Sequence, residues 1–202
     1  MNTRNVILFT RSPRLGMVKR RLSRDIGMSD AWIFYRRNVR VISKRLALDP
    51  RWKLWLAVTP DTFEGNEPFW PNYIPTIRQG SGDIGARMYR CLSIFQTDPT
   101  ILIGTDIPDV TADLIWQAFE KFKGNDAIFG PAKDGGYWSV GFKPRLLARN
   151  PFKGVIWSSD SVMNQTINLL PINTRVGITK RLEDIDNRKS YMSHRDKFLI
   201  SL

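Results

Sequence analysis

The fold is decided by the stretch Thr100-Ile-Leu-Ile-Gly104-Thr-Asp106-Ile-Pro108-Asp109. Its first part is an unbroken apolar, β-branched run, which is typical of a strand buried on both faces, as in a parallel sheet. Asp106 and Asp109 follow at once, and Pro108 fixes the backbone between them. The stretch therefore predicts a buried strand that carries carboxylates at its C-terminal end.

Carboxylates at a strand end are a common way to present a hard cation such as Mg²⁺ to phosphate oxygens. Asp106 and Asp109 are therefore candidate metal ligands. The alternative is that Asp109 caps a helix that begins near Thr111, and that Asp106 accepts hydrogen bonds from loop amides. Taken alone, the segment supports the two interpretations equally.

Strands and helices alternate on both sides of this stretch. We expect strands at 6–10, 52–58, 74–78, 100–104 and 126–129, and helices at 17–26, 30–48, 84–95, 111–122 and 162–170. Such alternation implies right-handed crossovers and a mostly parallel sheet that is covered on both faces. We therefore predict an α/β fold, a three-layer α/β/α sandwich, with the loops after Thr10, Gly104 and Phe129 at one edge of the sheet.

The composition indicates how many domains the chain forms and which compartment it suits. A chain of 202 residues suffices for one substantial core, so we expect one domain over residues 1–202. Cys91, the only cysteine, repeats with the apolar face of its helix and is expected in the core. A lone cysteine fits a reducing compartment, no Cys/His cluster suggests zinc, and no apolar run is long enough for a signal or a membrane span. We expect a cytoplasmic protein.

The loop after the first strand is strongly basic, in a chain with a formal charge of +12. Arg11 to Gly16, with Lys19 and Arg21 beyond, places cations and amide donors at a helix start, where a diphosphate would bind well. The loop matches neither a dinucleotide fingerprint nor a Walker loop. On this segment alone, a solvated basic loop is slightly better supported than a phosphate site.

The segment Gly130-Pro-Ala-Lys-Asp134-Gly135-Gly136-Tyr137-Trp138 is harder to explain as ordinary structure. Paired glycines let a backbone approach a ligand closely. The alternative is a hairpin turn at Asp134-Gly135. A turn explains Gly135 but not the dense aromatic neighbours, so we favour a ligand site.

Later segments have ordinary interpretations. Ser159 or Asp160 is expected to cap the helix that begins at Val162. The run Leu182-Glu-Asp184-Ile-Asp186 sets two acids on one side of an extended segment, from which one could reach the metal, although a surface acidic turn is the default. His194 has no Cys or Ser partner that spacing identifies, and a hydrolase triad has no support.

The ordered set of these segments resembles the DUF2064 family of predicted glycosyltransferases over nearly the whole chain. The matching pieces are Phe9-Thr-Arg-Ser-Pro13 with Gly16, Lys19, Arg21 and Leu22; Gln79-Gly80 with Gly82-Asp83-Ile-Gly85 and Arg87-Met88; Gly104-Thr-Asp106-Ile-Pro108-Asp109; Gly130-Pro131 with Asp134-Gly-Gly-Tyr137; Phe152 with Trp157 and Asp160; and Asp184-Ile-Asp186. Two departures are Arg20, where Thr is typical, and Asn187-Arg188-Lys189-Ser190, where the family continues with a Thr-Pro-Glu-Asp type run. The second departure weakens the case for a metal or nucleotide role of the terminal segment.

The resemblance implies the GT-A, or nucleotide-diphospho-sugar transferase, fold and a role for each loop. The implied nucleotide and phosphate contacts are Arg11, Gly16, Lys19, Arg21, Gly82 and Arg87. The implied acceptor or sugar contacts are Gly135, Gly136, Tyr137 and Trp157. Asp106, with Asp109 and Asp186 as further candidates, would hold Mg²⁺ or Mn²⁺.

The leading functional hypothesis is transfer of a sugar from a nucleotide-diphospho-sugar to a small-molecule acceptor, with Asp106 at the metal and Asp134 as general base. The closest rival is nucleotidyl transfer, in which a phosphorylated small molecule attacks a nucleoside triphosphate, as in phospholactate guanylyltransferases. A third hypothesis is a non-enzymatic basic protein that binds nucleic acid or an acidic membrane. The acidic loops and the lack of an RNA-binding signature disfavour specific nucleic-acid binding, whereas peripheral contact with an anionic membrane can coexist with catalysis.

Overall fold

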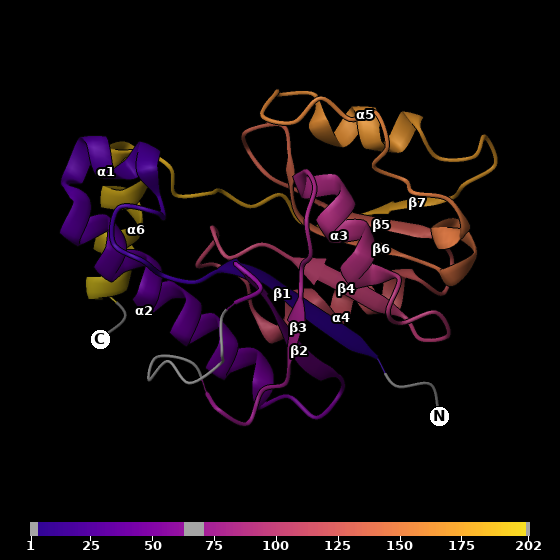
Figure 1. The fold of residues 1–202 in the computed structure, drawn as a ribbon, viewed down its shortest axis with the longest axis horizontal. Coiled ribbons are helices and arrows are strands. Elements are labelled where there is room, and N and C mark those ends of the chain that lie inside the picture. Colours follow the sequence, from indigo (N-terminus) through magenta and orange to yellow (C-terminus); the bar gives the residue numbers. More distant parts are fainter. Residues whose placement is uncertain (1–3, 63–70, 201–202) are drawn as a thin grey trace.

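A computed structural model describes residues 4–62 and 71–200, with side chains up to Arg195. The chain forms a seven-stranded sheet flanked by helices (Figure 1). The strands are β1 (Asn5–Arg11), β2 (Lys53–Thr59), β3 (Thr76–Arg78), β4 (Thr100–Ile103), β5 (Ala127–Pro131), β6 (Tyr137–Phe142) and β7 (Val176–Ile178). The helices are α1 (Arg20–Ile26), α2 (Met28–Ala47), α3 (Ile84–Leu92), α4 (Ala112–Lys121), α5 (Val162–Asn168) and α6 (Arg188–Ile200), with a 3-10 turn η1 (Pro144–Ala148).

The sheet is mostly parallel, as predicted. Its strand order is β3-β2-β1-β4-β6-β5-β7, and β1 pairs in parallel with both β2 and β4. Only β6 runs the other way, antiparallel to both β4 and β5. The short connection from β5 to β6 explains this reversal, because a parallel pair would need a long crossover. The C-terminal ends of β1, β4 and β5 therefore share one edge of the sheet.

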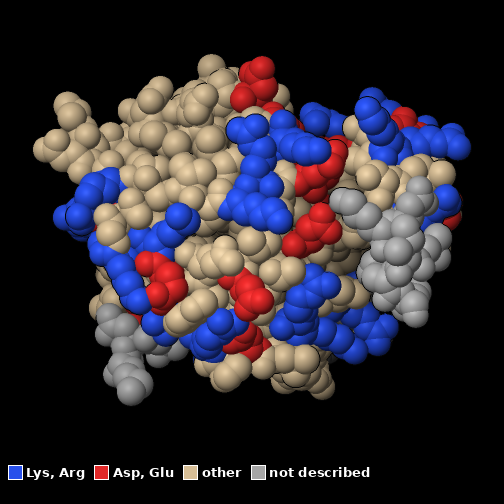
Figure 2. Space-filling view, turned by 180° about the vertical axis from the view of Figure 1, so that it is seen from behind, with Lys and Arg blue, Asp and Glu red and all other residues tan. Residues whose placement is uncertain are grey.

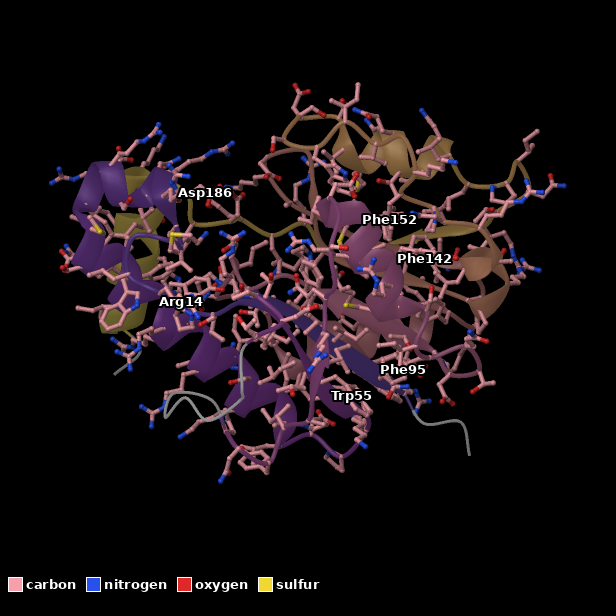
Figure 3. All side chains as sticks on the ribbon, in the orientation of Figure 1. Arg14, Trp55, Phe95, Phe142, Phe152 and Asp186 are labelled. Atoms are coloured by element: carbon pink, nitrogen blue, oxygen red, sulfur yellow. The ribbon has the colours of Figure 1, made fainter. Side chains whose placement is uncertain are left out.

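Helices cover both faces of the sheet and complete the three predicted layers. Val6 and Leu8 of β1 belong to an apolar cluster that includes residues of α2 and α4. Ile7, which points to the opposite face, belongs to a second cluster with residues of α3 and α5. Phe142 and Phe152 lie in this second cluster with ring centroids 5.7 Å apart (Figure 3).

Helices α1 and α6 pack together beside the sheet and carry a small core of their own (Figure 1). Leu22, Ala31 and Ile185 are buried there, and the rings of Phe34 and Tyr191 meet edge to face at 5.5 Å. The segment 179–187 runs from the end of β7 across the sheet edge to α6. This path brings residues from opposite ends of the chain into contact.

Three local predictions need correction. The helix expected from Met17 begins at Arg20, because Lys19 has φ 47° and ψ 45°, a left-handed conformation that cannot extend a right-handed helix. Thr111, not Asp109, caps α4, since its hydroxyl accepts from the amide of Leu114. Neither Ser159 nor Asp160 caps α5: the residue before this helix is Ser161, which makes no side-chain cap.

The burial of Cys91 and the length of the apolar helices can be compared with the expectations from composition. Cys91 is fully buried on α3, and burial raises the pKa of its thiol to about 12, so it is a core residue as predicted. In the described ranges, no helix has both the length and the apolar character that a membrane span requires.

Candidate active site

A cavity of about 380 Å³ opens at the C-terminal edge of the sheet, beside β1. The chain passes from β1 to β2 on one side and later returns to place β4 on the other side of β1. Such a switch point leaves a crevice that is a frequent ligand site in open α/β sheets. The cavity is lined by Phe9, Thr10, Arg11, Met17, Val18, Lys19, Arg20, Arg21, Tyr35, Thr59, Gln79, Ile84, Arg87, Thr105, Asp106 and Asp186.

An ammonium group joins two carboxylates in the wall of this cavity. Lys19 Nζ lies 2.8 Å from Asp106 Oδ1 and 2.9 Å from Asp186 Oδ1, and it donates to the carbonyl of Ile185 at 2.8 Å. The Lys19 side chain is only 4% exposed. Burial disfavours its charge, but Asp106 and Asp186 outweigh this and raise the pKa of Lys19 above its ordinary value.

Asp186 reaches this cluster because the terminal segment is held against the end of β4. The amide of Ile185 donates to the carbonyl of Asp106 at 3.1 Å, and Arg21 Nη1 lies 3.8 Å from Asp186 Oδ2. Figure 3 shows Asp186 between the α1–α6 pair and the sheet. Asp186 was predicted as a metal ligand, and the structure brings it and Asp106 to the same ammonium.

The carboxylate chemistry fits a hard divalent cation. Mg²⁺ is usually held by one or two carboxylates together with substrate phosphates and water. Asp106 and Asp186 supply this number, and the parts of the chain with described side chains contain no group of three or more His, Cys, Asp or Glu that could hold a metal by themselves. A metal here would need further ligands from phosphate and water.

Two arginines face the same cavity without acidic partners among the described residues. Arg11 and Arg87 both line it, and Arg87 Nη1 lies 3.4 Å from the hydroxyl of Thr59. The pKa of Arg87 is lowered by burial and then by the charge of Arg11. Two like charges in one cavity wall favour an anion between them, as the predicted phosphate contact requires.

Tyr35 and Asn38, which the sequence interpretation missed, fix the loops that carry the site. The Tyr35 hydroxyl contacts Thr10 Oγ1 at 2.9 Å and accepts from the amide of Arg11 at 3.0 Å, while Asn38 Nδ2 donates to the carbonyl of Thr105 at 2.6 Å. Both are nearly buried on α2. Polar residues three positions apart on the core face of a helix were the signal that could have found them.

Gln79, for which the sequence predicts no role beyond the family motif, ties β1 to β2. It is fully buried, and its Nε2 donates to the carbonyls of Thr10 and Ala57, both at 2.7 Å. The first strand end and the start of α3 are thereby held in one geometry. Gly82 lies in the loop that follows, outside the cavity wall.

The paired glycines of the β5–β6 turn face protein rather than the cavity. A Cβ on Gly135 would lie 1.8 Å from the backbone oxygen of Asp160, and Gly136 donates its amide to Asp134 Oδ1 at 2.9 Å. The turn joins antiparallel strands as a hairpin, and a ligand contact at Gly135 and Gly136 stays a prediction. Asp134 is exposed, and its charge acts on Asp184, whose pKa is raised to about 6 by burial first and by Asp134 and Asp186 next.

Other predicted contacts also lie outside the cavity wall. The Tyr137 ring packs against Phe129, and burial raises the pKa of its hydroxyl. A Cβ on Gly85 would lie 2.6 Å from the Trp157 ring, so Trp157 packs on α3.

Gly16, which was predicted to contact phosphate, has φ 75° and sits against Met28. Asp109 is not part of the cavity wall, and its Oδ1 lies 3.8 Å from His194 Nδ1.

Comparison with known proteins identifies the family of this chain. Residues 42–159, more than half of the chain, match the model of the family described as uncharacterized protein conserved in bacteria (DUF2064). The chain belongs to this family. No match is found among curated proteins.

Solved structures share the fold. A crystal structure from Desulfovibrio desulfuricans G20, provisionally named a nucleotide-diphospho-sugar transferase, is 26% identical with a TM-score of 0.80, over 93% of this chain and 84% of that one. 4-Diphosphocytidyl-2C-methyl-D-erythritol synthase from Anaerococcus prevotii DSM 20548 is 11% identical with a TM-score of 0.66, over 98% and 96%. CMP:2-keto-3-deoxy-manno-octonic acid synthetase in complex with CTP is 10% identical with a TM-score of 0.61, over 99% and 100%. The fold is that of nucleotide-diphospho-sugar transferases and cytidylyltransferases, and the similarity supports a transferase.

Proposed function

We propose that this protein transfers a sugar from a nucleotide-diphospho-sugar to an acceptor hydroxyl, with Mg²⁺ or Mn²⁺ bound at Asp106 and Asp186. The observation that carries the proposal is the meeting of these carboxylates, from distant parts of the chain, in a cavity that Arg11, Arg21 and Arg87 also line. Carboxylates for a cation beside arginines for phosphate are what a metal-bound diphosphate needs. The similarity to a provisionally named sugar-nucleotide enzyme supports the same donor class.

The roles of the chain follow from charge and position. Arg11 and Arg87 would bind the diphosphate, and Arg21 would add charge at the rim near Asp186. A bound metal would neutralise the charge that develops on the departing diphosphate. The protein mainly orients donor and acceptor and supplies fixed charge where the bond breaks.

We assign the acceptor proton to Asp134. This carboxylate is exposed on the β5–β6 turn at the edge that carries the cavity, and its charge reaches Asp184 on the neighbouring terminal segment. The acceptor and sugar would then lie between the cavity and this turn. The single cysteine, Cys91, is a free and buried thiol. A free thiol fits the reducing cytoplasm, where we place the reaction.

Thermal unfolding with a panel of UDP-, GDP-, ADP-, CDP- and dTDP-sugars, each with and without Mn²⁺, tests the donor class. A ligand that binds only the native state raises the melting temperature. With the donor found, Asp106→Asn should lower turnover by roughly 10²–10³-fold while the protein stays folded. Asp113→Asn, at an exposed acid of α4, is the matched control. Full activity of Asp106→Asn would exclude the assignment.

A second candidate, nucleotidyl transfer, is favoured by the charge balance of the cavity. Its wall holds the basic residues Arg11, Lys19, Arg20, Arg21 and Arg87 against the acidic residues Asp106 and Asp186. This surplus suits a triphosphate as well as a diphosphate. Phosphorus NMR separates the two reactions, because nucleotidyl transfer releases pyrophosphate and sugar transfer releases a nucleoside diphosphate.

A purely electrostatic binder has less support. Figure 2 shows basic side chains in separate clusters with acidic side chains among them, rather than one continuous basic surface on that face. Specific nucleic-acid binding is therefore disfavoured. Peripheral contact with anionic lipid remains compatible with transfer to a lipid-linked acceptor, and sedimentation with phosphatidylserine vesicles at low and moderate salt tests it.

A further inference from the structure

The feature that the proposed function leaves unexplained is the position of the Lys19 ammonium. Its three hydrogens can make three hydrogen bonds, and three acceptors surround it: Asp106 Oδ1, Asp186 Oδ1 and the carbonyl of Ile185. Its side chain is nearly fully buried, whereas Asp106 is 55% exposed and Asp186 33% exposed. In this arrangement Lys19 neutralises the carboxylates from inside and has no hydrogen left for a phosphate.

The backbone at Lys19 is held in a conformation that a lysine seldom adopts. Its φ of 47° and ψ of 45° are left-handed, although it directly precedes α1. Such a conformation costs a non-glycine residue free energy and persists only where the surroundings require it. The ion pairs with Asp106 and Asp186 are among the contacts that offset this cost.

A divalent cation would compete for the same inner oxygens. Metal–oxygen bonds to Mg²⁺ are about 2.1 Å long, and an ammonium between the carboxylates excludes a cation from that place. With Lys19 and Arg21 present, the charges of Asp106 and Asp186 are already balanced. The ligand-free site therefore attracts a metal weakly, unless phosphates bring further negative charge and oxygen ligands.

We propose that Lys19 is a built-in substitute for the divalent cation: its ammonium occupies the cation's place in the ligand-free protein, a bound metal displaces it, and it turns to the phosphates when a nucleotide binds as well. The exchange rests on the metal site of the proposed function, and the coupling rests on its nucleotide as well. The lysine stem is flexible, and Lys19 already lines the cavity, so its ammonium can rotate toward a ligand. Metal and nucleotide should then each raise the affinity of the other, since such coupling is reciprocal.

The first experiment measures Mn²⁺ binding by electron paramagnetic resonance without nucleotide. Lys19→Met should bind Mn²⁺ about tenfold or more tightly than the wild type, because the competing cation is gone. Lys133→Met is the matched control. Lys133 lies outside the cavity wall and pairs at 2.7 Å with Glu183, which is on the same terminal segment as Asp186. The Lys133→Met variant should bind Mn²⁺ as the wild type does. Equal or weaker binding by Lys19→Met would overturn the exchange and make Lys19 a residue that positions the carboxylates.

A second measurement uses the wild type and so does not depend on how the variant folds. Acetylation by acetic anhydride, followed by mass spectrometry of peptides, reports the exposure of each lysine. Saturating Mn²⁺ alone should speed acetylation of Lys19 relative to exposed Lys133. An unchanged Lys19 rate at a Mn²⁺ concentration that saturates the site would contradict the exchange.

A third arm separates this proposal from the proposed function. Adding UDP, GDP, ADP or CDP to the wild type should tighten Mn²⁺ binding with at least one of them, and the effect should shrink in Lys19→Met. If none changes Mn²⁺ binding, the nucleotide assignment fails and the coupling to nucleotide fails with it. The exchange of Lys19 for metal would still be supported or refuted by the two measurements without nucleotide.

Discussion

The loop after β1 and the turn between β5 and β6 look alike in the sequence and differ in the structure. Both follow strands that end at the same edge of the sheet, and both combine glycine with charged residues. In the first, Arg11 and Lys19 line the cavity. In the second, Gly135 lies against the backbone of Asp160, and the charged residues Lys133 and Asp134 lie outside the cavity wall. Whether a glycine marks a ligand or a packing contact thus depends on what faces its α-carbon.

The sharpest test of this difference is Gly135→Ala. The new Cβ would collide with the carbonyl of Asp160, and φ at this position is 89°, so we expect a loss of about 3–5 kcal/mol in the free energy of unfolding. Gly154→Ala, at φ 97° with open space around it, is the control and should lose only about 1–2 kcal/mol. Urea unfolding measures both. Similar losses at the two sites would mean that conformation alone requires glycine in the turn.

On the loop side, Arg87→Met should weaken nucleotide binding by about tenfold or more without unfolding the protein. The expected loss is that of a charge-assisted hydrogen bond, about 1.5–3 kcal/mol. Arg78→Met, on the exposed side of β3, is the control and should bind as the wild type does. Isothermal titration with the best nucleotide, in the presence of Mn²⁺, makes the comparison. Unaltered affinity would move the phosphate away from the Arg11–Arg87 pair.

The two regions meet at Asp184, whose pKa of about 6 lies above its ordinary value. The folded state therefore binds this proton more tightly, and stability falls as the pH rises from about 4 through 6. Asp184→Asn should stabilise the protein at pH 7.5 by about 0.5–1 kcal/mol, after allowance for solvent screening of a half-exposed group, and should have no effect at pH 4. Urea unfolding at both pH values is the measurement. Equal stabilisation at both would point to packing rather than charge.

The smallest effect is expected at Asp109. It follows β4 as Asp106 does, but it lies near His194 and outside the cavity wall. Asp109→Asn should change Mn²⁺ and nucleotide binding less than twofold, whereas Asp106→Asn should abolish the metal dependence. A loss at Asp109→Asn comparable to that at Asp106→Asn would restore the paired carboxylate that the sequence suggested.

Local pattern predicted the layers, the mostly parallel sheet and the edge that carries the site, because alternation of strands and helices leaves few arrangements open. It could not predict that Lys19 adopts a left-handed backbone or that its ammonium meets Asp186, since that contact spans 167 residues of sequence. It also could not show why Gly135 is a glycine, because the neighbour that requires it is the backbone of a distant segment. Side-chain type predicts chemistry well only where the fold has already fixed the partner.

The strap formed by residues 179–187 has a consequence for how the protein is made. Lys19 and Asp106 leave the ribosome well before Asp186, whose neighbour Ile185 donates its amide to the carbonyl of Asp106 in the folded protein. The carboxylate pair at Lys19 is therefore incomplete on the ribosome until residues 179–187 have been made.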